Sequence, residues 1–148
     1  PQLTPPSYPM EAAKEGTGAN LYVIVEFAGD GKVIRAAVER MEIMPSYARK
    51  PGDLAKLGAR FEQATLKAVQ GWRYPVEWVK SMEGGLARIP VNFRMRDQTW
   101  SRIYEMEKRE IPWLDAPRAV HVANVSASGE MGSKRVVLLN RPEEGAAL

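Results

Sequence analysis

The sequence contains no cysteine, so disulfide bonds, thiolate zinc sites and cysteine nucleophiles are all excluded. Histidine is almost as scarce. With a single histidine, His121, a multi-histidine metal site is excluded, and because His121 falls in a segment expected to form a strand, a Ser-His-Asp triad is not favoured. We therefore expect no catalysed reaction, no metal and no cofactor.

Long apolar runs and basic blocks are missing as well. No hydrophobic stretch approaches the roughly 20 residues that a membrane-spanning helix needs. The 21 basic and 18 acidic side chains give a net charge of +3, but they are interleaved along the chain. Without a Lys/Arg cluster, nucleic acid is not an expected partner. With 148 residues, 45% of them hydrophobic, the chain is long enough for one globular domain and an appendage.

The N-terminal part of the chain contains three segments of different composition. Residues 1–9 include four prolines, which favour an extended and semi-rigid lead. A short helix is expected between Pro9 and Gly16, with Ser7 as its cap. A β-hairpin follows, because apolar residues alternate over 21–39 on both sides of the turn sequence AGDGK.

Beyond a proline-containing loop at 44–53, apolar residues recur at helical spacing. Asp53 is expected to cap a helix over 54–71 that covers one face of the hairpin. Its apolar stripe comprises Leu57, Phe61, Ala64, Ala68 and Trp72. A third strand is expected over 86–96, and Pro90 places that strand at a sheet edge because proline cannot donate a ladder hydrogen bond.

The C-terminal third is harder to interpret. A short helix is expected over 98–110, with Trp100 and Tyr104 on one side. A second hairpin is expected over 118–142, because apolar alternation flanks a Gly/Ser-rich centre. The last residues, 143–148, are expected to fray.

The order of these segments is familiar. Tyr8-Pro9 heads a short helix, and a strand with Val23, Val25 and Phe27 follows. GDGKV comes next, then an amphipathic helix that runs into WRYP, and finally IPVNFRMR. Over residues 5–97, this succession resembles the C-terminal domain of the TonB family of energy transducers.

The resemblance implies an α+β fold: a three-stranded antiparallel sheet with two helices packed on one face. We expect 1–7 to be the end of a proline-rich linker, 8–97 to be the domain, and 98–148 to add a helix and a hairpin. The chain departs from the family in three ways. Ser7 stands where the best-known members have Gln, the loop at 44–53 is longer, and nothing in the family accounts for 98–148.

The resemblance also implies a function. Domains of this family lie in the periplasm of Gram-negative bacteria, tethered to the inner membrane. They receive energy from the ExbB–ExbD motor through an N-terminal anchor, which we expect to precede Pro1. They bind a short peptide, the TonB box, of TonB-dependent outer-membrane transporters by adding it as a strand beside the third strand. A homodimer is left open.

The sequence adds a physical argument for such an edge. Backbone groups alternate in direction along a strand, and Pro90 has no N–H, so Pro90 is expected on the unpaired side. By parity, Asn92, Arg94 and Arg96 then direct their backbone groups outward. Tyr8, near the entry of the lead, is expected to add side-chain contacts. The expected peptide-binding residues are Ser7, Tyr8, Pro9, Pro90, Asn92, Arg94 and Arg96.

Other interpretations stay open. An edge with proline and arginine is also how proteins prevent unwanted pairing, and the C-terminal hairpin could itself fill the edge. An adaptor or assembly protein could use the same fold for fixed contacts, with 98–148 as its main interface. A small enzyme built on Glu105, Glu107 and Glu110 is a distant third alternative, because those residues fit a solvated helix face.

Overall fold

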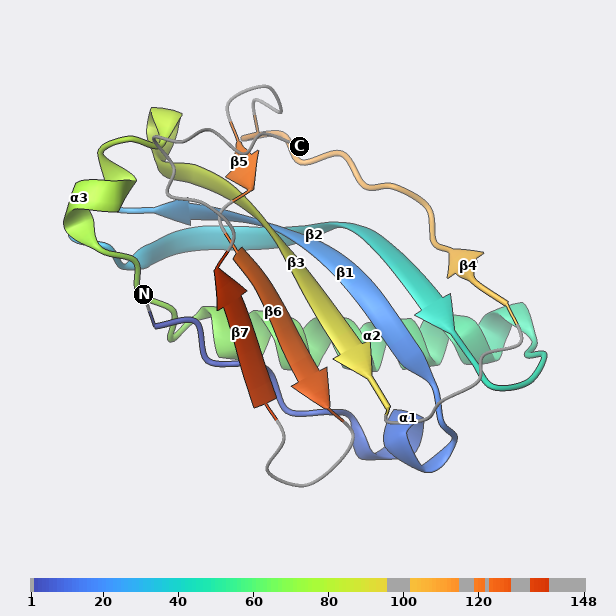
Figure 1. The fold of residues 1–148 in the computed structure, drawn as a ribbon. Helices are drawn as coiled ribbons and strands as arrows, with labels where there is room; N and C mark the ends of the chain where they lie inside the picture. The colour runs from blue at the N-terminus through green and yellow to red at the C-terminus, as the bar shows by residue number, and fades with distance from the viewer. Residues whose placement is uncertain (1, 96–101, 115–118, 122, 129–133, 139–148) are drawn as a thin grey trace.

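The computed structural model describes residues 2–95, 102–114, 119–121, 123–128 and 134–138. The fold is α+β, as expected, with one mixed β-sheet and one long helix (Figure 1). The helices are α1 (Met10–Lys14), α2 (Pro51–Val69) and α3 (Val76–Val79), and a 3-10 turn, η1, spans Glu83–Gly85. The strands are β1 (Gly18–Phe27), β2 (Val33–Met44), β3 (Leu86–Arg94), β4 (Tyr104–Glu105), β5 (Val120–His121), β6 (Ala123–Ser128) and β7 (Lys134–Leu138).

The three expected antiparallel strands form the middle of the sheet. β1 and β2 make the predicted hairpin, and β3 pairs antiparallel with the other side of β1. The turn depends on Gly31, whose φ of 87° is a left-handed conformation that glycine adopts without strain. The sheet continues beyond these strands, in the order β4-β2-β1-β3-β6-β7, so a three-stranded sheet was too small an expectation.

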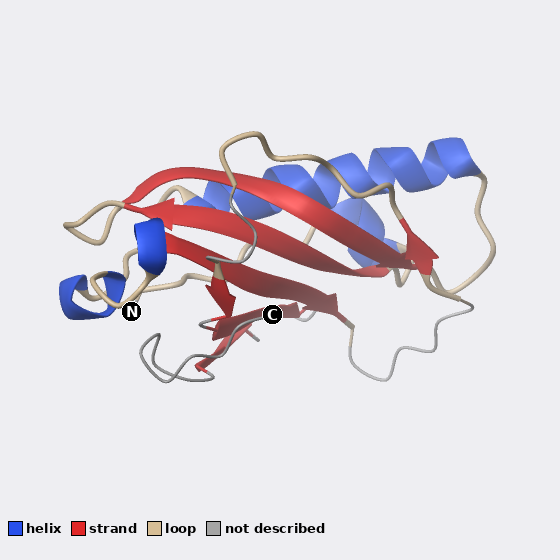
Figure 2. Cartoon of the chain, turned by 90° about the horizontal axis from the view of Figure 1, so that it is seen from above, coloured by secondary structure: helices blue, strands red, loops and turns tan. Residues whose placement is uncertain are grey.

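Helix α2 lies along one face of the sheet and provides most of its cover (Figure 2). The core contains Leu57, Phe61 and Trp72 from the predicted stripe, but Ala64 and Ala68 are only half-buried. Instead, the buried side of the helix turns toward Leu54, Thr65 and Val69. The helix also begins three residues early, at Pro51, because proline is well suited to the first helical turn. Asp53 is therefore not the cap.

The proline-rich lead packs on the domain. The indole N–H of Trp72 donates to the carbonyl oxygen of Thr4 over 2.8 Å, and Leu3 is buried in the core. Gln2 and Arg73 exchange two backbone hydrogen bonds. Ser7 does not cap α1, whose N-cap position is Pro9. The division of the chain at residue 7 remains a prediction, but residues 2–9 are part of the packed structure.

The expected helix over 98–110 is wrong for the described part of that range. Residues 102–110 contain the short strand β4 and extended chain, which run beside β2. Residues 98–101, including Trp100, lie outside the described residues. The second hairpin is confirmed as β6 and β7, although its turn at 129–133 and the expected frayed tail also lie outside them.

Candidate functional site

The outer edge of β3 is not vacant, which corrects the central expectation from the sequence. β5 pairs with β3 at Ala87 and Arg88, and β6 pairs with it from Val91 to Arg94. Both pairings are parallel, and the arrows of β3 and β6 point the same way in Figure 1. The chain's own C-terminal segment thus takes the position that the sequence predicted for a visiting peptide.

Pro90 lies where this pairing is interrupted. Ala87 is opposite Val120, an offset of 33, whereas Val91 is opposite Val125, an offset of 34. The C-terminal segment therefore has one extra residue across the gap. Because proline has no N–H to donate, a break in the ladder at this position leaves no donor unsatisfied on Pro90. The proline marks a bulge between two paired stretches instead of a free edge.

The physical reason for the correction is that β6 extends the core. Its alternate residues Ala123, Val125 and Ala127 are at most 1% exposed and belong to the same apolar cluster as Leu3 and Phe93. Burying apolar surface on one face of an added strand stabilises it beyond its ladder hydrogen bonds. Pro90 alone could not reveal this, because it is compatible with an edge and with a bulge.

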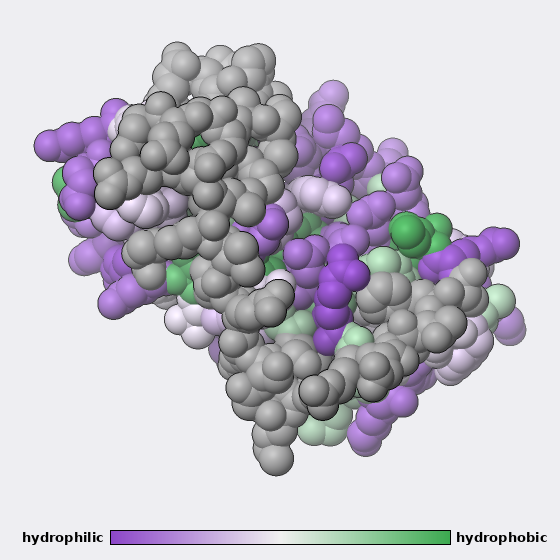
Figure 3. Space-filling view, in the orientation of Figure 1, coloured by the Kyte–Doolittle hydropathy of each residue, from purple (hydrophilic) through white to green (hydrophobic). Residues whose placement is uncertain are grey.

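Asn92 and Arg94 lie on the face of the sheet opposite α2, where hydrophilic side chains gather (Figure 3). Asn92 is half-buried and Arg94 exposed. Nearby, the hydroxyl of Tyr22 donates to Glu42 over 3.3 Å. Burial and the Glu42 carboxylate raise the pKa of Tyr22, and Arg40 and Arg94 partly oppose this. Arg96 lies outside the described residues.

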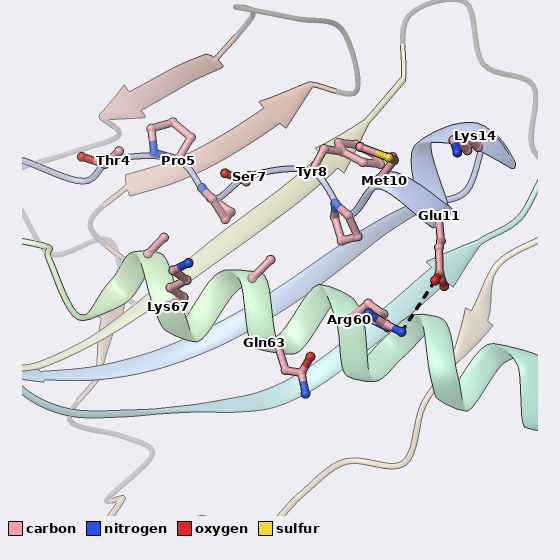
Figure 4. Close-up of a pocket in the computed structure, with 14 residues that line it drawn as sticks. Thr4, Pro5, Ser7, Tyr8, Met10, Glu11, Lys14, Arg60, Gln63 and Lys67 are labelled. Carbon is pink, nitrogen blue, oxygen red and sulfur yellow. Dashed lines mark ion pairs between the residues drawn. The ribbon is translucent and has the colours of Figure 1, made fainter.

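Ser7, Tyr8 and Pro9 lie elsewhere, in a groove of about 810 Å³ between the lead and α2 (Figure 4). The structure therefore divides the predicted site residues into two groups. The groove is lined by Thr4, Pro5, Pro6, Ser7, Tyr8, Pro9, Met10, Glu11, Lys14, Arg60, Gln63, Ala64, Lys67 and Ala68. Ala64 and Ala68 were predicted on the buried stripe of α2, and the position of the lead beside them has no signal in the sequence.

Tyr8 has a structural role that the sequence did not indicate. Its ring meets those of Phe61 and Phe93 edge to face, at centroid distances of 5.9 and 5.5 Å. Its hydroxyl donates to the carbonyl oxygen of Thr17 over 2.6 Å. Burial raises the pKa of Tyr8 well above its usual range. The side chain thus connects the lead to α2 and β3.

The opposite edge of the sheet is partly covered by the C-terminal segment too. β4 pairs with β2 at Glu42 and Ile43. Further along, the backbone N–H of Met106 donates to Met41 and that of Arg109 to Glu39, over 2.9 and 3.0 Å. This arrangement has no signal in the sequence, because an amphipathic pattern over 98–110 favours a helix when its partner strand is unknown.

The acidic side chains that the sequence offers for catalysis or metal binding can be located within the described part of the chain. Among those residues, no three His, Asp or Glu side chains gather as metal ligands would. Glu105, Glu107 and Glu110 are exposed. Within the same residues, none of the helices has both the length and the apolar character needed to cross a bilayer.

Comparison of the chain with models of known protein families, with curated proteins and with solved structures finds no match in any of the three. The architecture defines the class of the protein, an α+β domain with a mixed sheet.

Proposed function

We propose that the chain is the periplasmic docking domain of a TonB-like energy transducer. In this proposal it binds a TonB box peptide from an outer-membrane transporter and catalyses no reaction. The ExbB–ExbD motor would act on it through an N-terminal anchor at the inner membrane. Docking uses the outer edge of β3 and therefore requires that β5 and β6 leave it.

One observation carries this proposal. In residues 10–94, a short helix precedes an antiparallel β2-β1-β3 arrangement, and one long helix covers a single face of it. This is the order of elements that the resemblance implies. It supports the family interpretation because the motifs alone predict the central strands and α2 in this order.

A peptide can pair with β3 only by displacing β5 and β6, and this displacement costs free energy. The paired stretches of β5 and β6 provide a few ladder hydrogen bonds, each worth about 0.5–1.5 kcal/mol net. The internal strand is also tethered, so a free peptide competes against an effective concentration on the order of millimolar. A peptide must therefore make better side-chain contacts than Ala123, Val125 and Ala127 do, and full-length binding is expected to be weak.

A disulfide lock tests the proposal. Asn92 faces Ser126 across the parallel ladder, and neighbouring strands lie about 4.8 Å apart, within reach of a disulfide. The chain has no cysteine of its own, so Asn92→Cys with Ser126→Cys gives one defined bond. Synthetic transporter N-terminal peptides are titrated into the oxidised and reduced forms while the amide signals of Val91 and Arg94 are followed. Binding is expected in the reduced form and not in the oxidised one.

The adaptor interpretation is the second candidate, and a specific observation favours it. The outer edge of β3 and part of the β2 edge are both paired with the chain's own C-terminal segment. A domain built for fixed contacts has no need of a vacant edge. Equal peptide binding by the oxidised and reduced forms, or none by either, would contradict exchange at β3 and leave the adaptor.

A further inference from the structure

Hydrogen bonds near both ends of the lead fix its position beside α2, and the groove lies between the two. Trp72 binds the carbonyl oxygen of Thr4, and Tyr8 binds that of Thr17. Between these two anchors Pro6 is buried, and the neighbouring prolines restrict the backbone further. The wall formed by the lead is therefore preformed, and a ligand does not have to order it.

The α2 side of the groove combines short and long side chains. Ala64 and Ala68 lie one helical turn apart and present only methyl groups, while Arg60 and Lys67 extend from the same helix beside them (Figure 4). From Arg60 to Ala68 is eight residues, or about 12 Å of helix. That length accommodates roughly four residues of extended chain.

The groove has an excess of positive charge. Lys14, Arg60 and Lys67 line it against a single carboxylate, Glu11, which gives three charges minus one. Glu11 and Arg60 approach to 3.6 Å, but they are 66% and 58% exposed, so solvent screens their attraction. Neither lysine forms an ion pair within the described part of the chain.

We propose that this groove docks an extended, acidic segment of a partner protein. Small apolar residues of that segment pack over Ala64 and Ala68, and its carboxylates approach Lys67, Arg60 and Lys14. Pro5, Pro6 and Pro9 have no N–H, so strand pairing with the lead is disfavoured and recognition depends on packing and charge. The site is separate from the β3 edge and does not depend on the exchange proposed there.

A fluorescein-labelled peptide that repeats Glu-Pro-Ala is the probe, and fluorescence anisotropy with the full chain is the measurement. Saturable binding is expected at low salt. Arg60→Glu with Lys67→Glu should raise Kd at least about ten-fold, and the difference should shrink as salt screens the pairs. The matched control, Lys56→Glu with Lys80→Glu, changes the net charge equally at exposed positions outside the groove and should leave Kd unchanged.

Three results would overturn the inference. The first is an equal loss in the control pair, which would indicate general attraction to a positively charged domain. The second is the absence of saturable binding at millimolar protein. The third is tighter binding by a single-stranded oligonucleotide that the Arg60 and Lys67 reversal abolishes, because it would assign the groove to phosphate. None of them affects the disulfide-lock result, so this site and the β3 edge are tested separately.

Discussion

Glu39 and Arg88 form a buried, two-point ion pair across the central strand of the sheet. The Nε and Nη2 atoms of Arg88 lie 3.2 and 3.4 Å from the two carboxylate oxygens of Glu39. The two residues are only 6% and 8% exposed. β1 pairs its Tyr22 with Arg40 and its Val23 with Val38, so Glu39 is the extra residue of a β-bulge. The bulge allows a carboxylate in the middle of β2 to meet an arginine on β3.

Removing one member of this pair should be severe. Arg88→Met leaves the Glu39 carboxylate buried without its cation, and the free energy of unfolding is expected to fall by about 3–5 kcal/mol. Adding Glu39→Leu to the same protein should recover much of that loss, because no charge then remains to desolvate. Urea denaturation of the two variants measures both effects. A double variant as unstable as the single one would show that packing, and not charge, determines the cost.

The hairpin turn offers a matched pair of glycines. A Cβ on Gly31 would clash with the backbone oxygen of Tyr74, and the φ of 87° at Gly31 is unfavourable for alanine. Gly31→Ala should therefore cost at least about 2 kcal/mol, since backbone strain alone reaches 1–3 kcal/mol. Gly29→Ala has no atom within 4 Å of the new methyl group and should change the stability by under about 0.5 kcal/mol. Thermal unfolding of the two single variants separates the cases, and similar losses would contradict the geometry.

Tyr8 makes stability depend on alkaline pH. Its pKa is raised by burial in the folded state above an unfolded value of about 10. A raised pKa means that the folded state favours the neutral phenol. The stabilising contribution of Tyr8 to folding is therefore complete below about pH 10 and is lost as the pH rises further. Tyr8→Phe should cost about 0.5–1.5 kcal/mol near neutrality through the lost bond to Thr17. That difference should narrow above about pH 10 in denaturation measured across pH, and a constant difference would contradict the assignment.

Val125 tests whether β6 belongs to the cooperative fold. It is fully buried, so Val125→Asp would force a carboxylate into the core unless β6 detaches. We expect a detached strand, seen as faster amide hydrogen exchange for the backbone of β6. The control Ser126→Asp points to the half-buried outer face and should leave exchange nearly unchanged. Equal acceleration in both variants would show that β6 does not depend on the core.

The central elements could be predicted because local rules agree there. Alternating apolar residues and a glycine turn predict β1 and β2, and a helical apolar stripe predicts α2. None of these predictions requires knowledge of a distant contact. The ends of α2 were less predictable, since Pro51 and Asp53 are both acceptable near a helix start. Tyr8 is predicted to make peptide contacts, and the sequence did not indicate that its ring also packs against Phe61 and Phe93 in the core.

In the C-terminal third, the hairpin of β6 and β7 could be predicted from its own alternation, but its place in the sheet and the strands β4 and β5 could not. The short strands β4 and β5 have no pattern of their own and exist because β2 and β3 offer them partners. A parallel neighbour such as β6 is reached only through a long crossover, so no turn sequence marks it. The groove likewise depends on how the lead packs against α2, a tertiary contact without a local signature.

The parallel arrangement of β3 and β6 has a consequence for biosynthesis. Val91 and Val125 are partners, yet they lie 34 positions apart in the sequence, so β3 emerges from the ribosome before its neighbour does. During that interval the nascent chain exposes an unpaired edge of β3, and unpaired strand edges promote aggregation. Pro90 interrupts the hydrogen-bonding groups of this edge near the middle of β3. The residue that shapes a bulge in the mature protein would then also protect the unfinished one from misassembly.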